Sequence, residues 1–160
     1  MDPSLKHKIR SSLLVVIFII FIIGFIRPWL HLGFYKVGRY IYITDPLVNP
    51  ANLAKFFHEL NISKGDSNAL LGMIIASSFL YLITTFSILG GFKDIRSLIV
   101  SGGLGIASGL IWMIMYNYLV NILTEPSLGL ASLFIDITIW PYAAIGLGAL
   151  EIILYIFMKD

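Results

Sequence analysis

Glu151 is the residue whose type and position come closest to active chemistry in this 160-residue sequence. It is the one carboxyl group inside four long apolar runs, and an ionised carboxylate is costly in apolar surroundings. Such a group can carry protons or bind a cation, or it can make a structural hydrogen bond or reach toward the membrane interface. We expect Glu151 to face the interior of a helical bundle. Its candidate partners are Thr84, Thr85, Arg96 and Arg10.

No second group completes a catalytic constellation around this carboxyl. The sequence contains no cysteine, which excludes disulfides, thiolate metal sites and thiol catalysis. The histidines, His7, His31 and His58, lie far apart, and no predicted helix brings two of them face to face, so neither a haem nor a metal centre is indicated. We therefore expect no catalytic residue, no metal and no cofactor.

The four apolar runs are the elements that must position Glu151. The chain is 58% hydrophobic and 12% charged, whereas a soluble domain has about 25% charged residues. A helix of about 20 apolar residues matches the hydrocarbon core of a bilayer. The net charge of +2 is too small to suggest nucleic-acid binding. The sequence predicts an all-α integral membrane protein, a four-helix transmembrane bundle in a single domain, residues 1–160. The expected spans are residues 11–32, 69–89, 98–118 and 137–157.

Lysine and arginine near the span ends predict the orientation in the bilayer. Lys6, Lys8 and Arg10 precede the first span, and Lys93 and Arg96 lie between the second and third. Four crossings place these positions on one side, so we expect both termini in the cytoplasm and the loops 33–67 and 119–136 outside. The first run continues into Arg27-Pro28-Trp29 and not into a small-residue cleavage site, so we expect it to be retained as a span.

The first outer loop is expected to fold into a small extracellular segment. Residues Tyr35–Thr44 are typical of a β-strand. Asn49 can then cap a short helix with Pro50 at its first position. The apolar stripe of this amphipathic helix consists of Leu53, Phe56, Phe57 and Leu60. We expect the helix to lie on the bilayer surface or on the tops of the spans.

The outer ends of the first and fourth spans carry a second set of candidates. Arg27 and Asp136 bracket these two spans at similar depth and can pair across the bundle. Trp29 is expected in an aromatic belt at the membrane interface. Leu128–Ile135 is expected to begin the fourth helix above the membrane, and Pro141 should bend that helix or mark its true start.

Small residues recur on the third and fourth spans. Ser101, Gly105 and Gly109 stand four residues apart on the third, and Ala144 and Gly148 on the fourth. Small residues at i and i+4 let two helix backbones approach closely in lipid. Two alternatives remain open, packing inside one monomer or a self-association face between copies.

The order of these features resembles the claudin and peripheral-myelin-protein superfamily. Arg27-Pro28-Trp29 is similar to the Pro-x-Trp that leads that family's first extracellular segment into a strand. The turn Lys93–Arg96 is tight and basic, and the third span opens on Ser101-Gly102-Gly103. The family's Gly-Leu-Trp with two flanking cysteines is missing here. The resemblance implies a left-handed four-helix bundle with an outer β element, working by lateral or cell-to-cell contact and not by catalysis.

A looser likeness is to DoxX-type membrane subunits, which have an amphipathic segment like Ala51–Leu60 before their second span. The acidic residue common in that span is absent here. Two functions follow. The first is a non-enzymatic protein that contacts lipid and either itself or other membrane proteins, as a self-associating scaffold or an accessory subunit. The alternative is a subunit of a quinone-linked oxidoreductase, or a small proton- or ion-coupled transporter using Glu151.

Overall fold

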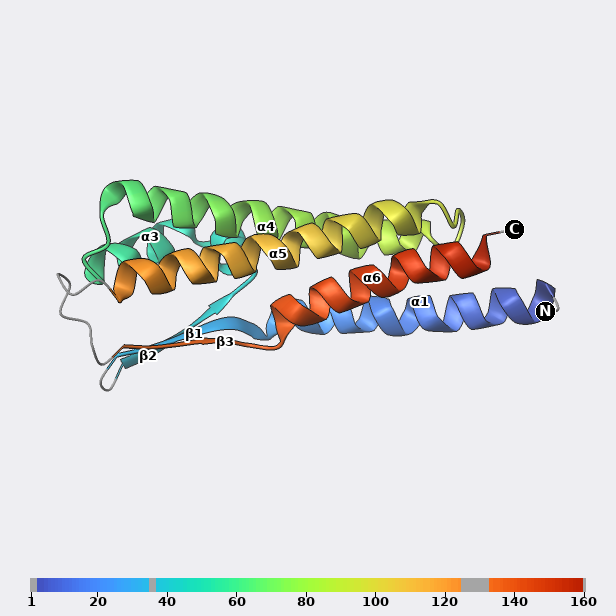
Figure 1. The fold of residues 1–160 in the computed structure, drawn as a ribbon, viewed down its shortest axis with the longest axis horizontal. Helices are drawn as coiled ribbons and strands as arrows, with labels where there is room; N and C mark the ends of the chain where they lie inside the picture. The colour runs from blue at the N-terminus through green and yellow to red at the C-terminus, as the bar shows by residue number, and fades with distance from the viewer. Residues whose placement is uncertain (1–2, 35–36, 125–132, 160) are drawn as a thin grey trace.

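In the computed structural model, four long helices lie side by side and a small sheet extends from one end of the bundle (Figure 1). The structure describes residues 3–34, 37–124 and 133–159. The long helices are α1 (Pro3–Ile26), α4 (Lys64–Gly90), α5 (Ser97–Leu123) and α6 (Trp140–Met158). The prediction of four helices long and apolar enough to cross a membrane is confirmed.

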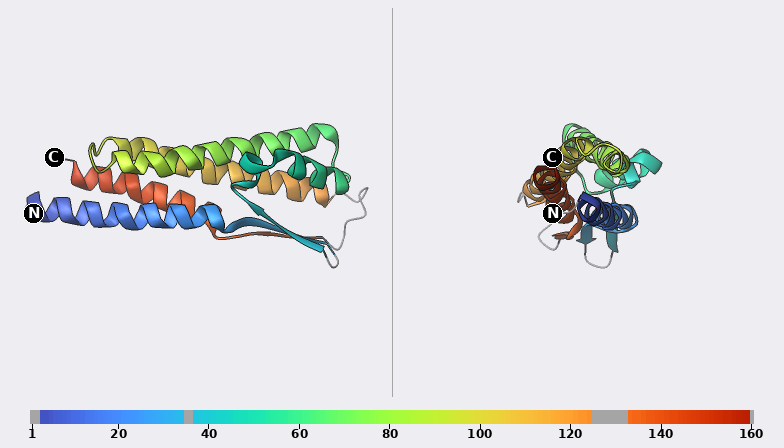
Figure 2. Two further views of the ribbon diagram at one scale, coloured as in Figure 1. Left: turned by 180° about the vertical axis from the view of Figure 1, so that it is seen from behind. Right: turned by 90° about the vertical axis from the view of Figure 1, so that its right-hand side faces the viewer.

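Helices α4 and α5 run on past the ends of α1 and α6 (Figure 1). Each has 27 residues, about 40 Å of helix. Beside their extra length lie the sheet and two short helices, α2 (Asp45–Val48) and α3 (Pro50–Glu59), and α3 contacts α4. The start of α1, the end of α6 and the turn between α4 and α5 share the opposite end of the bundle, as both side views in Figures 1 and 2 show.

Strands β1 (Pro28–Phe34), β2 (Val37–Tyr42) and β3 (Leu133–Ile137) form an antiparallel sheet in the order β2-β1-β3. Leu30 lies opposite both Ile41 and Ile137, and all three belong to the hydrophobic core or pack against it. The next residue, His31, lies opposite Tyr40 and Asp136. Because side chains alternate along a strand, Leu30, Ile41 and Ile137 lie on the face that packs against the core, and His31, Tyr40 and Asp136 lie on the other face.

The end of α1 differs from the sequence prediction. The apolar pattern predicts a first span reaching residue 32, but α1 ends at Ile26 and β1 begins at Pro28. Proline has no N–H to donate within a helix, and it disfavours helical backbone at the residue before it, Arg27. The segment that follows is therefore strand.

The start of the fourth helix also differs. The sequence predicts that Leu128–Ile135 begins this helix, but residues 133–135 belong to β3, and residues 128–132 lie outside the described part of the chain. Helix α6 begins at Trp140, with Pro141 in its first turn. Pro141 thus marks the true start of the helix. The sequence predicts one strand, whereas the described residues form three.

The amphipathic helix is confirmed, but its apolar stripe packs on protein. Asn49 caps α3 through its side chain, which accepts a hydrogen bond from the Asn52 N–H at 3.2 Å. Leu53 and Phe57 are completely buried, and Phe56 and Leu60 pack against the same core. Figure 2 shows α3 beside α4, over the inner side of the sheet. A membrane surface is therefore not needed to bury this stripe.

Candidate functional site

Trp29 joins α1 to the sheet. A helix continuing past Ile26 would use the N–H of residue 28 to bond the Gly24 carbonyl, but Pro28 has none. The Trp29 indole Nε1 donates to that carbonyl instead, at 2.9 Å. Its ring meets the rings of Tyr81 and Trp112 edge-on, with centroids 4.9 and 5.3 Å apart. The sequence places Trp29 in an interfacial belt, whereas the structure buries it completely.

The small residues of the third and fourth spans pack α5 against α6 within one chain. A Cβ on Gly102 would lie 2.5 Å from the Gly148 carbonyl oxygen, and one on Gly109 would lie 2.5 Å from the Pro141 carbonyl oxygen. A Cβ on Gly105 would lie 3.4 Å from the Ala144 carbonyl oxygen, an ordinary contact distance. The buried residues of this contact are Ser101, Gly102, Gly105, Gly109, Ala144 and Gly148. They are not exposed to a second copy.

Glu151 is completely buried where α5 meets α6. The Ser101 hydroxyl donates to its Oε2, and its Oε1 has no hydrogen-bond partner in the described part of the chain. The sequence prediction of Thr84 and Thr85 as partners is wrong, because these hydroxyls donate to carbonyls one turn back in α4. The suggested arginines, Arg10 and Arg96, line a pocket at the end of the bundle instead.

A pair of serines that the sequence analysis does not single out holds α4 to α5. The Ser77 hydroxyl donates to the Ser108 carbonyl at 2.9 Å, and the Ser108 hydroxyl donates to the Ser77 carbonyl at 3.0 Å. Both residues are completely buried. The reciprocal bonds satisfy these polar groups inside an apolar bundle, so their role is structural.

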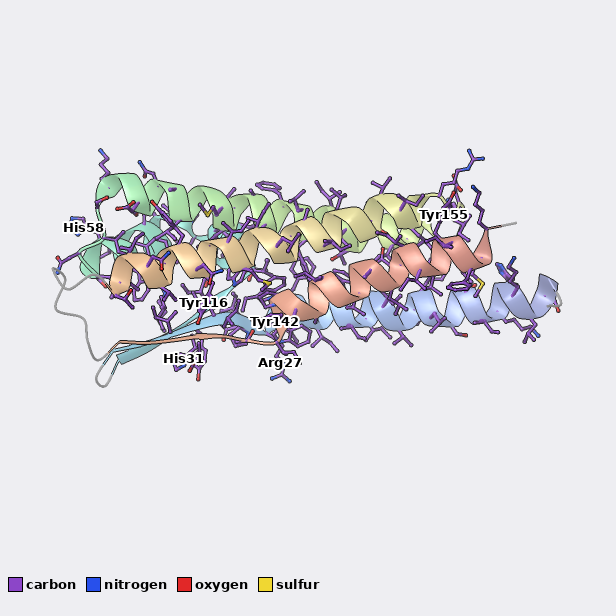
Figure 3. All side chains as sticks on the ribbon, in the orientation of Figure 1. Arg27, His31, His58, Tyr116, Tyr142 and Tyr155 are labelled. Atoms are coloured by element: carbon purple, nitrogen blue, oxygen red, sulfur yellow. The ribbon has the colours of Figure 1, made fainter. Side chains whose placement is uncertain are left out.

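The outer pair expected between Arg27 and Asp136 is not formed. Arg27 is exposed at the end of α1 and points away from the bundle (Figure 3). Asp136 lies opposite His31 in the sheet. His31 is four residues after Arg27 in the chain, a distance of about 13 Å along a strand. Among the described residues no ion pair joins them. The described part of the chain contains no group of three or more His, Cys, Asp or Glu side chains that could hold a metal ion.

An open apolar groove lies along α4 and α5. It has a volume of about 490 Å³ and is lined by Ala69, Gly72, Met73, Ala76, Ile111 and Ile114. A Cβ on Gly72 would meet no atom within 4 Å. Because this residue has no side chain, it leaves open space where it lines the groove. The lining comes from the first half of α4 and the second half of α5, the stretch that runs past α1 and α6 (Figure 1).

Together these features define a helical protein with four helices suited by length and composition to a membrane and a three-stranded sheet at one end. No protein-family model, curated protein or solved structure matches the chain. The features from which a function can be inferred are therefore the apolar groove, the buried carboxyl group of Glu151 and the pocket at the end of the bundle.

Proposed function

We propose that this chain is a non-enzymatic integral membrane protein that crosses the bilayer four times and acts through lateral contact with itself or with another membrane protein. The apolar groove is the observation that carries the proposal. In lipid, helices associate mainly by close packing, and small residues let a second helix approach. Gly72 and Ala76 form a floor of small side chains, and Ile111 and Ile114 lie beside it. An apolar helix of a partner fits such a groove.

The proposed orientation has both termini in the cytoplasm and the sheet with α3 outside. The basic residues at the end of the bundle that holds the α4–α5 turn support this choice. An outer β element directly after the first span is also what the resemblance to the claudin superfamily implies. In this proposal the protein serves as a self-associating scaffold or as an accessory subunit of a larger complex.

Gly72→Leu should weaken the lateral contact without harming the fold. The new side chain enters open space in the isolated chain but occupies the groove. Overpacking a close contact costs about 1–3 kcal/mol, so the association constant should fall about 5- to 150-fold. The measurement is native mass spectrometry and cross-linking after extraction in mild detergent, which also gives the identity and copy number of the partner.

Gly146→Leu is the matched control. Gly146 also faces open space, but on α6, so this variant adds the same side chain away from the groove. It should retain the wild-type complex. Equal amounts of complex with both variants, or a wild-type chain that is always single, would contradict the proposed contact.

Glu151 supports a second candidate function. Its unpartnered Oε1 is unusual in a buried position, where polar groups normally find partners. A carboxyl group held in this way can take up and release a proton during transport. Such a carboxyl group can also bind a quinone headgroup, which agrees with the likeness to DoxX-type subunits. The first proposal needs no such chemistry from Glu151.

Glu151→Gln separates the two functions. The amide can still accept a hydrogen bond from Ser101 and has the same shape, so we expect stability within about 1 kcal/mol of wild type and an intact complex. Ser101→Ala is the control, which keeps the carboxyl but removes its donor. In reconstituted vesicles, a fall of about a hundredfold or more in proton- or quinone-coupled activity for Glu151→Gln alone would favour the second function.

A further inference from the structure

A pocket at the end of the bundle away from the sheet gathers three cationic side chains. Its volume is about 260 Å³, and it is lined by Arg10, Ile95, Arg96, Tyr155, Met158 and Lys159. The cations come from three separate places, namely α1, the turn before α5 and the residue after α6. Figure 3 shows Tyr155 at this end of the molecule.

The cations around this pocket have no anionic partner among the described residues. The Nε of Arg10 is buried and makes no hydrogen bond, and its Nη2 lies 3.4 Å from the His7 ring nitrogen Nδ1. The Nζ of Lys159 lies over the Tyr155 ring, 5.6 Å from its centroid. Three like charges around one cavity repel one another, and a bound anion removes that cost.

The nearest carboxyl groups of the described chain are engaged elsewhere. Asp94 Oδ1 accepts a hydrogen bond from the backbone N–H of Arg96, at 2.9 Å. Glu151 lies one turn before Tyr155 in α6 and accepts its hydrogen bond from Ser101. Neither carboxyl lines the pocket. Among the described residues, therefore, neither of these two carboxyl groups supplies a negative charge to the pocket, and an anion that balances its cations would come from outside.

We infer that this pocket binds the phosphate group of an anionic lipid headgroup. The volume is many times the roughly 10–15 Å³ that one water needs. Guanidinium groups match phosphate geometry with paired donors. The side chains of Ile95, Tyr155 and Met158 give the pocket an apolar side suited to the glycerol and upper acyl chain. The inference rests on the membrane crossing in the proposed function, which puts the pocket at headgroup depth, and it does not depend on the lateral contact.

The test is titration of the intact chain with phosphatidylglycerol, phosphatidylcholine and inorganic phosphate, followed by native mass spectrometry in detergent. The variants are Arg10→Gln, Arg96→Gln, Lys159→Gln and all three together. Each removed cation should weaken phosphatidylglycerol binding about fivefold, and the triple variant should weaken it about a hundredfold. Lys93→Gln is the control, because Lys93 is an exposed cation of the same turn that does not line the pocket.

Three results decide the matter. Loss in the pocket variants alone, with weak binding of phosphatidylcholine and of inorganic phosphate, establishes a lipid-headgroup site. Equally tight binding of inorganic phosphate, lost in the same variants, keeps the anion site but makes free phosphate its source. Equal phosphatidylglycerol binding by the triple variant and Lys93→Gln overturns the inference. Every variant should still float with lipid vesicles, and a wild-type chain that fails to float contradicts the membrane crossing itself.

Discussion

Replacing Gly102 by leucine should destabilise the folded chain by about 3 kcal/mol or more, whereas the same change at Gly103 should be neutral. A Cβ at position 102 would lie 2.5 Å from the Gly148 carbonyl oxygen and 2.8 Å from the Ile152 Cγ1. The first of these atoms belongs to backbone and cannot turn away. Helices α5 and α6 would therefore have to separate along their whole contact, a severe case of overpacking.

Gly103 is the control one residue further along α5. A Cβ there would meet no atom within 4 Å, and leucine has a better helix propensity than glycine by somewhat less than about 1 kcal/mol. Gly103→Leu should therefore be as stable as wild type or slightly more stable. The measurement is equilibrium unfolding in mixed detergent micelles, followed by circular dichroism. Similar losses of stability in the two variants would show that α5 and α6 are not packed in this register.

The contact between α5 and α6 is the part of the site that sequence could predict most fully. Consecutive spans are antiparallel, and the small residues mark the two faces that meet. The structure pairs Gly109 with Pro141 and Gly102 with Gly148. Ser101 is the residue before Gly102 and Glu151 lies three residues after Gly148, so this hydrogen-bonded pair lies next to the Gly102–Gly148 contact. The small-residue pattern therefore contained the information needed to predict Ser101 as the partner of Glu151, whereas the threonines and arginines that the sequence analysis proposes are not its partners.

The sheet could be predicted only in part. The end of α1 follows from Pro28, a local signal. In contrast, Leu133–Ile137 is a short apolar run, which hydrophobicity alone does not assign to helix or strand. Its pairing with β1, some hundred residues earlier in the chain, decides the matter. The two polar residues expected to pair, Arg27 and Asp136, are kept apart by this long-range register.

The groove is a consequence of tertiary structure that no local pattern encodes. Gly72 lies in an apolar run much like those around Gly102 and Gly148, yet a Cβ at this position would meet no atom within 4 Å. It lies on the outer side of α4, whereas Leu70 and Ile74 of the same helix face the core and are buried. Which glycines fill a contact and which leave a hollow thus depends on whether another element packs against that side of the helix, which the apolar run itself does not state.

Trp29→Ala should destabilise the chain by about 3–5 kcal/mol, the range for truncating a large buried aromatic side chain. The ring is completely buried and contacts both Tyr81 and Trp112. Trp29→Phe should cost less, about 1–3 kcal/mol. It keeps an aromatic ring in the cluster but leaves the Gly24 carbonyl without the indole donor that replaces the missing N–H of Pro28.

Phe79→Ala provides the control, because this α4 side chain is 51% exposed and its loss should cost about 1 kcal/mol or less. Unfolding in detergent gives the three free energies. Limited proteolysis adds a local readout, since loosening the joint between α1 and β1 should speed cleavage within the sheet in both Trp29 variants and not in Phe79→Ala. A Trp29→Phe variant as stable as wild type would mean that the Gly24 carbonyl finds another donor, and that the joint is held by ring packing alone.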